Sequence, residues 1–418
     1  MRIETDCVQA GYNPTNGSPR VLPIYQSTTY KYDSSEYLGD LFDLKAEGHI
    51  YSRISNPTLA CVEEKIAKLE SGTAAMLASS GQSAIFLAIA NLCGSGSHVL
   101  SSSKIYGGTI NLMDVSLRRL GIEISFIDPD AGLEEIRGAI KPNTKLIYGE
   151  TISNPSLVVL DIEKFAKAAH ENNIPLMIDN TFTTPILCRP FEFGADIVVH
   201  SASKYLDGHA VALGGVVAES GKFDWSSGKF PGFTTPDESY HGLIYSKDAP
   251  NTPFITKARV QLMRDYGAIM SPHTAFLLNL GLETLHLRME RHSENALIVS
   301  KFLESHPKIE SVNYPGLESN KYHELQKKYF PKGSSGVVSF NIKGAKADCV
   351  KFMDNLKLAA IVTHVADART GAIHPASTTH RQLSGAALKA AGIGEALIRL
   401  SVGLENVNDI IEDIENAL

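Results

Sequence analysis

The feature that most constrains this chain is a series of short apolar runs that alternate with helical segments between residues 58 and 275. Helical stretches such as DIEKFAKAAHEN separate many of the runs. Short continuous apolar runs between helices are typical of strands that are buried on both faces. The pattern therefore predicts an α/β fold with a mainly parallel sheet covered by helices. The runs are HVLSSS, IEISFID, KLIYGE, PLMIDN, ADIVVHSAS and GGVVAE.

The segments on either side of this region differ from it in pattern. Residues 1–57 are polar, rich in turn residues and without helical periodicity, so we expect an extended arm that lies on a neighbouring subunit. After about residue 275, one long helical pattern leads into a smaller mixed α/β region. We therefore divide the chain into the arm, a large domain at 58–275 and a C-terminal domain at 276–418. Residues 220–255 interrupt the large domain with Gly, Pro and aromatic residues, and a connection of this length is usually functional or part of an interface.

Composition excludes several classes of protein. Apolar residues make up 43 % of the chain and charged residues 20 %, as in a soluble globular protein. The net charge of −7, with acids and bases interspersed, argues against nucleic acid or a membrane surface as the main partner. No apolar run reaches the length of a membrane span, and the N-terminus does not resemble a signal peptide. The cysteines lack CxxC spacing, so we expect reduced thiols in a cytoplasmic protein.

A lysine stands where one buried strand is predicted to end. The segment ADIVVHSASKYLDGH places Ser201, Ser203 and Lys204 directly after its apolar run. Ligands of such sheets bind at the carboxyl ends of the strands. Burial there would lower the pKa of the amine and favour its neutral, nucleophilic form, while the hydroxyl groups could hold a phosphate. Taken alone, the motif fits an exposed loop lysine equally well.

A second strand end strengthens the functional interpretation. Asp179 follows the run PLMIDN, and its distance from Lys204 along the chain fits one crossover helix and a neighbouring strand. An ionised aspartate that faces a pyridine nitrogen keeps that nitrogen protonated, as pyridoxal 5′-phosphate (PLP) chemistry requires. An aspartate at a strand end can also be a helix cap. Together, Asp179 and Lys204 favour the cofactor.

Two further segments could complete a cofactor site. Gly81 ends a short apolar run and Gln82 begins a helix, so backbone N–H groups there could bind a phosphate. The spacing is neither that of the GxGxxG fingerprint nor that of a P-loop. Tyr106 follows the HVLSSS run and could stack on a flat ring. We expect no metal site, because the histidines lack metal-binding spacing and are better interpreted as structural. These histidines are His200, His209, His364, His374 and His380.

In this order, the segments resemble the Cys/Met-metabolism family of PLP enzymes. That family includes cystathionine γ-synthase, the cystathionine lyases, methionine γ-lyase and the homoserine-ester sulfhydrylases. The resemblance implies the fold of the aspartate aminotransferases, fold type I, with the smaller α/β domain at the C-terminus. It covers nearly the whole chain and rests on IYSRISNPT, SSGQSAI, YGGT, ETISNP, IDNTF, HSASKYLDGH, SPHTAFLLNLGLETLHLRMERH, HPASTTH and IRLSVGLE.

The resemblance also implies roles for individual residues. Lys204 would carry PLP as a Schiff base and move protons, and Asp179 would pair with the pyridine nitrogen. The amides of Gly81 and Gln82, with the hydroxyl groups of Ser201 and Ser203, would bind the phosphate. The remaining implied roles are ring stacking and proton transfer for Tyr106, contact with the phosphate of the neighbouring subunit for Tyr51 and Arg53, binding of the substrate carboxylate for Arg399, and a place near the ring oxygen and the substrate for Asn154.

The sequence is less decisive about the reaction. Methionine γ-lyases typically have a cysteine where this chain has Gly108, and the insertion at 220–255 resembles that of O-acetylhomoserine sulfhydrylases. Next to Asp367, His364 and Ala366 replace the family's usual serine or asparagine and its glycine, which leaves the role of His364 at the substrate carboxylate open.

We therefore expect γ-replacement, in which O-acetyl-L-homoserine and sulfide give L-homocysteine and acetate for methionine biosynthesis. A γ-lyase acting on methionine or cystathionine, cystathionine γ-synthase, an O-succinylhomoserine sulfhydrylase and a non-catalytic binding protein are the alternatives. The family also implies a homotetramer built from two dimers.

Overall fold

The computed structural model describes residues 1–378 and 394–418, so His380 lies outside the described residues. Each predicted apolar run forms a strand of one seven-stranded sheet, in the order β1-β7-β6-β5-β4-β2-β3. The strands β2 to β6 are parallel to their neighbours within that group, and β7 is antiparallel to both β6 and β1. The strands are β1 (Ala74–Ala78), β2 (His98–Ser102), β3 (Glu123–Ile127), β4 (Thr144–Glu150), β5 (Leu176–Asp179), β6 (Ile197–His200) and β7 (Gly215–Glu219).

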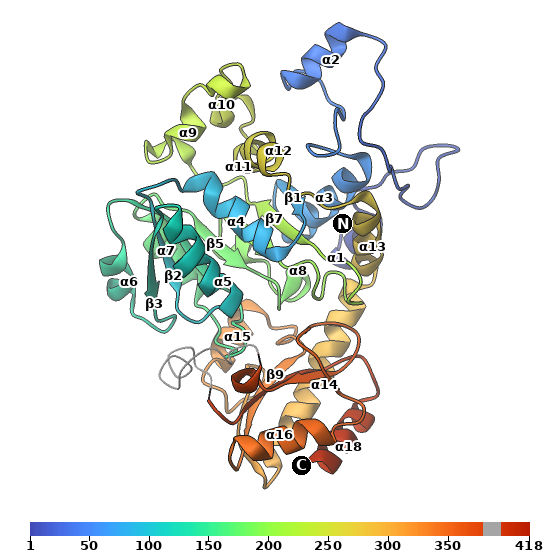
Figure 1. The fold of residues 1–418 in the computed structure, drawn as a ribbon, viewed down its shortest axis with the longest axis vertical. Coiled ribbons are helices and arrows are strands. Elements are labelled where there is room, and N and C mark those ends of the chain that lie inside the picture. The colour runs from blue at the N-terminus through green and yellow to red at the C-terminus, as the bar shows by residue number, and fades with distance from the viewer. Residues whose placement is uncertain (379–393) are drawn as a thin grey trace.

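Helices cover both faces of this sheet, which explains why its strands are almost wholly apolar (Figure 1). Successive strand residues enter separate cores, as Met76 and Leu77 of β1 do. The core of Leu77 contains residues of α3 (Pro57–Glu70), α7 (Ile162–His170), α8 (Thr184–Leu187) and α13 (Pro272–Glu283). The core of Met76 contains residues of α4 (Gly81–Leu92) and α11 (Pro253–Lys257). The mainly parallel, two-sided sheet is confirmed.

The long helical pattern after residue 275 forms two helices, α13 and α14 (Leu285–Ser305), separated at Thr284. The side chain of Arg288 spans this break. The guanidinium of Arg288 donates a hydrogen bond to the carbonyl of Gly281 at 2.6 Å and another to the carbonyl of Tyr205 at 2.7 Å. Gly281 itself lies against the backbone of Asp207, where a Cβ would come within 2.3 Å of the carbonyl oxygen. The loop that follows Lys204 is thereby tied to this helix junction.

A second, five-stranded sheet forms the C-terminal region, in the order β10-β11-β12-β9-β8. It lies at the opposite end of the molecule from α2 (Ser35–Phe42), beside α14 (Figure 1). Its strand β12 (Leu397–Ser401) pairs with a neighbour on each side and carries Arg399. The other elements are β8 (Ile309–Asn313), β9 (Val337–Ile342), β10 (Ala360–Ile361), β11 (Gly371–Ile373), α15 (His323–Tyr329), α16 (Lys346–Asn355) and α18 (Val407–Ala417).

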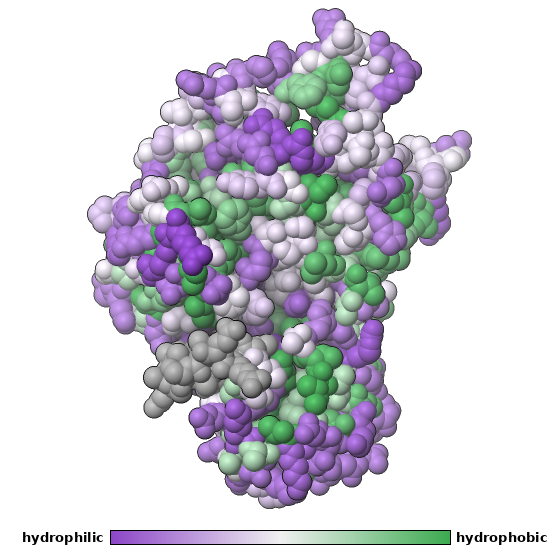
Figure 2. Space-filling view, viewed as in Figure 1, coloured by the Kyte–Doolittle hydropathy of each residue, from purple (hydrophilic) through white to green (hydrophobic). Residues whose placement is uncertain are grey.

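The N-terminal segment is not extended throughout. Residues Ile3–Gln9 form α1, whose Cys7 is fully buried and whose Asp6 pairs with Lys68 of α3 at 3.0 Å. The helix α2 instead projects from the body, with Tyr37 and Phe42 exposed, and apolar surface is visible in that region (Figures 1 and 2). Among the described residues, no helix combines the length and the apolar character that crossing a membrane requires.

The insertion at 220–255 packs through aromatic side chains into the core that contains Met76. The ring of Trp225 stacks on that of Phe233 with centroids 4.2 Å apart, and both are buried. At the start of the insertion, the buried carboxyl group of Glu219 accepts hydrogen bonds from the amides of Phe254 (3.2 Å) and Ile255 (2.8 Å). Glu219 therefore joins the end of β7, an inner strand of the sheet, to α11, the helix that closes the insertion.

The buried Glu219 should make the protein less stable as the pH rises. Burial raises its pKa from 4.5 to about 8, so between these values the folded protein holds a proton that the unfolded chain has released. Stability then falls with rising pH, by up to about 1.4 kcal/mol per pH unit. Glu219→Gln should flatten this decline in denaturant unfolding between pH 5 and 8, whereas exposed Glu238→Gln should not. An unchanged slope in Glu219→Gln would contradict the assignment.

Candidate functional site

The carboxyl ends of β4, β5 and β6 open into a cavity of about 260 Å³ that also reaches β12. The cavity brings together most of the predicted residues, although they come from distant parts of the chain. Its lining includes Gly81, Gln82, Tyr106, Asn154, Asp179, Ser201, Ser203, Lys204 and Arg399.

Lys204 lies in the turn that follows β6, with its amide bonded to the carbonyl of Ser201 at 3.1 Å. Burial, and next the positive charge of Arg399, lower the pKa of its amine. A lowered pKa increases the fraction of neutral amine, the form that attacks a carbonyl carbon or removes a proton. Lys204 is the only lysine among the described lining residues of this cavity.

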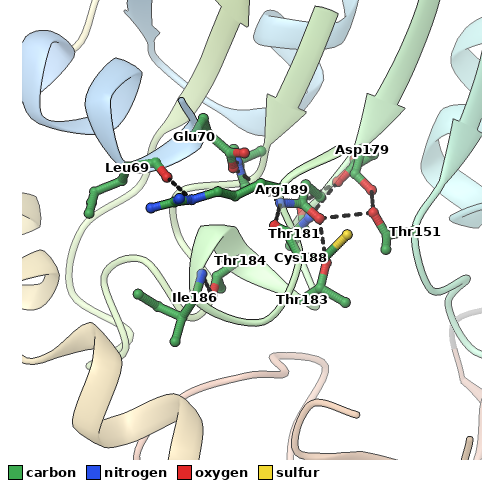
Figure 3. Close-up of polar contacts among 12 residues, drawn as sticks. Leu69, Glu70, Thr151, Asp179, Thr181, Thr183, Thr184, Ile186, Cys188 and Arg189 are labelled. Atoms are coloured by element: carbon green, nitrogen blue, oxygen red, sulfur yellow. Dashed lines mark hydrogen bonds and ion pairs between the residues drawn. The ribbon is translucent and has the colours of Figure 1, made fainter. Parts of the chain in front are cut away.

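Asp179 ends β5 and lies close to Thr181 (Figure 3). Burial raises the pKa of its carboxyl group, while hydrogen bonds from Thr181 oppose that effect. The amide of Thr181 donates to Asp179 Oδ1 at 2.9 Å, and its hydroxyl group, which also donates there, accepts the amide of Ser201 at 2.9 Å. Thr181 therefore links the Asp179 carboxylate to Ser201, one of the residues that are predicted to bind the phosphate. The sequence analysis did not identify it.

Glu150 is a second functional residue that the sequence analysis missed. It is buried at the end of β4, where Oε1 accepts the amide of Tyr106 at 2.7 Å and Oε2 accepts the amide of Asn154 at 3.2 Å. Burial, and next the charge of Asp179, raise its pKa well above the usual range. Glu150 thus fixes two residues of the cavity wall. The sequence signal that could have identified Glu150 is its position as the last residue of the run KLIYGE, at a predicted strand end.

Gly81 begins α4 where the helix passes directly over Ser201. A Cβ at Gly81 would lie 2.8 Å from the Cβ and 2.9 Å from the Cα of Ser201. Ser80 caps the helix by accepting the amide of Ser83 at 3.1 Å, which leaves the amides of Gly81 and Gln82 available to an anion. The side chain of Gln82 lines the same space, and its buried Oε1 has no hydrogen-bond partner in the described part of the chain.

Adding a methyl group at Gly81 should weaken cofactor binding. Overpacking of this kind costs about 1–3 kcal/mol, which corresponds to roughly a 5- to 150-fold loss of PLP affinity for Gly81→Ala. Titration of the apoprotein with PLP would measure it. Gly132→Ala is the matched control, because a Cβ there meets nothing within 4 Å. Equal affinities for the two variants would show that the close approach to Ser201 does not matter.

Arg399 reaches the cavity from the C-terminal sheet. Its Nη1 donates to Asn154 Oδ1 at 3.1 Å and its Nη2 to the carbonyl of Thr363 at 3.2 Å, while the buried Nε has no partner among the described residues. Burial lowers the pKa of its guanidinium to about 10. A buried guanidinium with a free N–H is suited to a carboxylate ligand. Asn154 lies beside it in the same cavity.

Three predicted residues are not in the cavity wall. Tyr51 and Arg53 lie on the N-terminal segment, exposed, with the guanidinium 5.2 Å from the centre of the tyrosine ring. His364 is half-buried. Its carbonyl accepts Arg399 Nη2 at 3.4 Å, and its ring nitrogen lies 3.9 Å from Asp367. Ala366, where the family's glycine was expected, has a φ of +69°, in the left-handed region that favours glycine.

Comparison with known proteins identifies the family. The model of the Cys/Met metabolism PLP-dependent enzyme family matches residues 4–418. The chain belongs to this family. An O-acetyl-L-homoserine sulfhydrylase of Leptospira meyeri is 45 % identical over 100 % of this chain and 97 % of its own length. A second one, from Corynebacterium glutamicum, is 44 % identical over 99 % of this chain and 96 % of its own length.

A solved structure from Campylobacter jejuni is also similar. It has a TM-score of 0.96 and 41 % identity, and the match covers 100 % of this chain and 99 % of that one. It is described as an O-acetylhomoserine (thiol)-lyase and contains pyridoxyl-lysine-5′-monophosphate. The fold class and the dependence on PLP are thereby confirmed.

The residues of the cavity fit this cofactor. Lys204 supplies an amine, Asp179 a carboxylate at the strand end, and Gly81 a close approach at a helix N-terminus. The Nε of Arg399 is a buried donor without a partner among the described residues, and it suits a substrate carboxylate. In the described residues, no group of three or more His, Cys, Asp or Glu could hold a metal ion.

Proposed function

We propose that this enzyme catalyses γ-replacement, converting O-acetyl-L-homoserine and sulfide to L-homocysteine and acetate in methionine biosynthesis. Its similarity to O-acetyl-L-homoserine sulfhydrylases extends over essentially the full length of both chains, including the insertion at 220–255. The observation that carries the proposal is the pairing, in one cavity, of the Lys204 amine with the partly unsatisfied guanidinium of Arg399. That pair suits an amino-acid substrate.

The chain's own residues would have the following roles in this reaction. Arg399 binds the α-carboxylate of the substrate, and Asn154 holds the guanidinium in place. Lys204 removes the proton from Cα and returns protons at later steps, which requires a neutral amine. When bound, PLP withdraws electrons from Cα, and a carboxylate at Asp179 sustains this by keeping the ring nitrogen protonated. Gly81, Gln82, Ser201 and Ser203 would hold the phosphate, and Tyr106 would stack on the ring.

Gly108 favours replacement over methionine γ-elimination. A Cβ at this position would lie 2.5 Å from the ring of Tyr106 and 2.7 Å from the amide nitrogen of Gln82. A cysteine, which methionine γ-lyases typically have here, would displace one of these side chains. The wall of the cavity next to Tyr106 therefore has no space for that thiol unless Tyr106 or Gln82 moves.

A steady-state comparison tests the function. The enzyme should form homocysteine from O-acetyl-L-homoserine and sulfide with a higher kcat/KM than from O-succinyl-L-homoserine and sulfide. With O-acetyl-L-homoserine, cysteine should be a poorer acceptor than sulfide. It should release little ammonia from methionine or cystathionine. Ammonia release from either compound at a kcat/KM above that of homocysteine formation would assign the enzyme to the lyases instead.

We also propose a cytoplasmic homotetramer built from two dimers, in which Tyr51 and Arg53 reach the partner's cofactor phosphate. Both residues are exposed and outside their own chain's cavity. The same segment carries exposed apolar side chains that need cover, namely Val21, Ile24, Tyr25, Tyr37, Phe42 and Leu44. All five cysteines are free, which suits a reducing compartment.

Removing the Arg53 side chain should weaken PLP binding without unfolding the protein. Loss of one charged hydrogen-bonding group from the phosphate should cost about 1.5–3 kcal/mol, or roughly 10- to 100-fold in PLP affinity. Arg53→Ala and the control Arg20→Ala, on the same exposed segment, can be compared by PLP titration and light scattering. Unchanged affinity in an intact oligomer would rule out the shared site.

A further inference from the structure

Behind the strand ends, on the face of the sheet opposite Asp179, lies a polar network with no exposure to solvent. Its centre is Glu70, the last residue of α3. Glu70 Oε1 accepts hydrogen bonds from His200 Nε2 at 2.6 Å and from Asn180 Nδ2 at 3.1 Å. The side chains of Glu70 and His200 have 0 % exposure. Neither Glu70 nor His200 has a role in the chemistry described above.

Asn180 extends the network to two more segments. Its Nδ2 also donates to the carbonyl of Cys188 at 2.9 Å, and its Oδ1 accepts from the hydroxyl groups of Thr151, at 2.8 Å, and Thr183. Glu70, Thr151, Thr183 and Cys188 lie together at the ends of the strands (Figure 3). One carboxylate on α3 is thus connected to the ends of β4, β5 and β6.

The members of the network are chain neighbours of the cavity residues. Thr151 follows Glu150, Asn180 follows Asp179, and His200 precedes Ser201. Successive residues along a strand point to opposite faces. The network therefore contacts, from the opposite face of the sheet, the peptide units that place Glu150, Asp179 and Ser201 in the cavity wall.

A buried carboxylate at this place is poorly explained by stability alone. Removing a carboxylate from water costs several kcal/mol, and apolar residues of similar volume often stabilise a protein as well or better. Glu70 Oε2 and His200 Nδ1 have no partner in the described residues, so the cost is not fully offset. What the carboxylate does provide is a directional acceptor shared by two strands, which fixes their ends relative to each other.

We propose that Glu70 is a positioning residue of the active site, which acts through His200 and Asn180 to hold Ser201 and Asp179 in the arrangement that binds PLP. The inference rests on the cofactor-binding roles proposed above for these two residues. It does not depend on which substrate the enzyme uses.

The first test compares Glu70→Gln with Glu64→Gln, the same substitution at an exposed position on the same helix. The glutamine carbonyl can take the place of Oε1, with the NH2 group in the place of the unpartnered Oε2, so the shared acceptor becomes neutral and weaker. We expect PLP affinity of the apoprotein to fall about 10-fold or more in Glu70→Gln and to stay unchanged in Glu64→Gln. The melting temperature of the Glu70→Gln apoprotein should stay within a few degrees of the parent. A lowered melting temperature with unchanged PLP affinity would show a purely structural role and overturn the proposal.

The second test separates positioning from folding if Glu70→Gln folds poorly. In His200→Gln, the side-chain amide can still donate to Glu70, whereas His200→Leu removes the donor. PLP affinity should be largely kept in His200→Gln and reduced about 10-fold in His200→Leu. Equal affinities in the two variants would overturn the proposal. Because PLP titration needs no substrate, a failure of the proposed sulfhydrylase reaction would not affect either result.

Discussion

Replacing Lys204 with alanine is expected to lower kcat for homocysteine formation by about 10⁴-fold, the upper range for loss of a general acid–base group. No other lysine lines the described cavity, so no second amine can take over the covalent attachment and the proton transfers. The surroundings of Lys204 also favour its neutral amine, because burial and the charge of Arg399 lower its pKa. Lys222→Ala, at an exposed lysine beyond β7, is the control and should retain full activity.

Covalent attachment gives an independent measurement for the same residue. Borohydride reduction followed by peptide mass spectrometry should find PLP on Lys204 in the parent enzyme and on no peptide of Lys204→Ala. Turnover within 10-fold of the parent, or a label on another lysine, would contradict the assignment.

Asp179→Asn is expected to lower kcat by about 10²- to 10³-fold, the usual effect of removing one charge-stabilising group from an active site. Asparagine has the same shape and can keep the hydrogen bonds from Thr181, so the change removes mainly the charge. Without a carboxylate, the ring nitrogen of PLP loses its counter-ion and the cofactor withdraws electrons less effectively. PLP should still bind, so the loss should appear in kcat more than in cofactor affinity.

Asp196→Asn provides the matched control. Asp196 is also buried next to this sheet, but it precedes β6 and bonds to His170 at 2.9 Å, at the end of the strands away from the cavity. Its replacement should reduce stability and leave kcat near that of the parent. A similar loss of kcat in both variants would mean that general loosening of the sheet, rather than the charge at Asp179, explains the effect.

Much of the site could be predicted because many of its residues lie at strand ends. Lys204, Asp179 and Ser201 each stand just after an apolar run, and parallel strands bring such residues to one edge. Arg399, Tyr51 and Arg53 carried no local signal and depended on the family resemblance. The geometry places Arg399 in the cavity, beside Asn154. Tyr51 and Arg53 lie outside it and remain a prediction about the partner subunit.

Other features could not be predicted from local pattern. The helical pattern after residue 275 is continuous in the sequence, whereas the structure divides it at Thr284, where Arg288 contacts Gly281 and Tyr205. The helix α1 was missed because a single short helix shows too few turns for periodicity to be recognised. Glu150 and Thr181 were missed because one polar residue near a strand end is common.

By itself, the sequence determined the mainly parallel α/β architecture and the lysine and aspartate at the strand ends, because these depend on short-range patterns of apolar runs and the residues that end them. Its resemblance to known motifs along the chain determined the PLP family. Only the tertiary structure decided that Glu150 holds Tyr106 and Asn154, and that Glu70 lies behind Asp179 and Ser201. Glu70 and Asn180 are 110 residues apart, and their hydrogen bond exists only once α3 packs against the sheet. No spacing in the sequence encodes a contact that depends on how two elements dock.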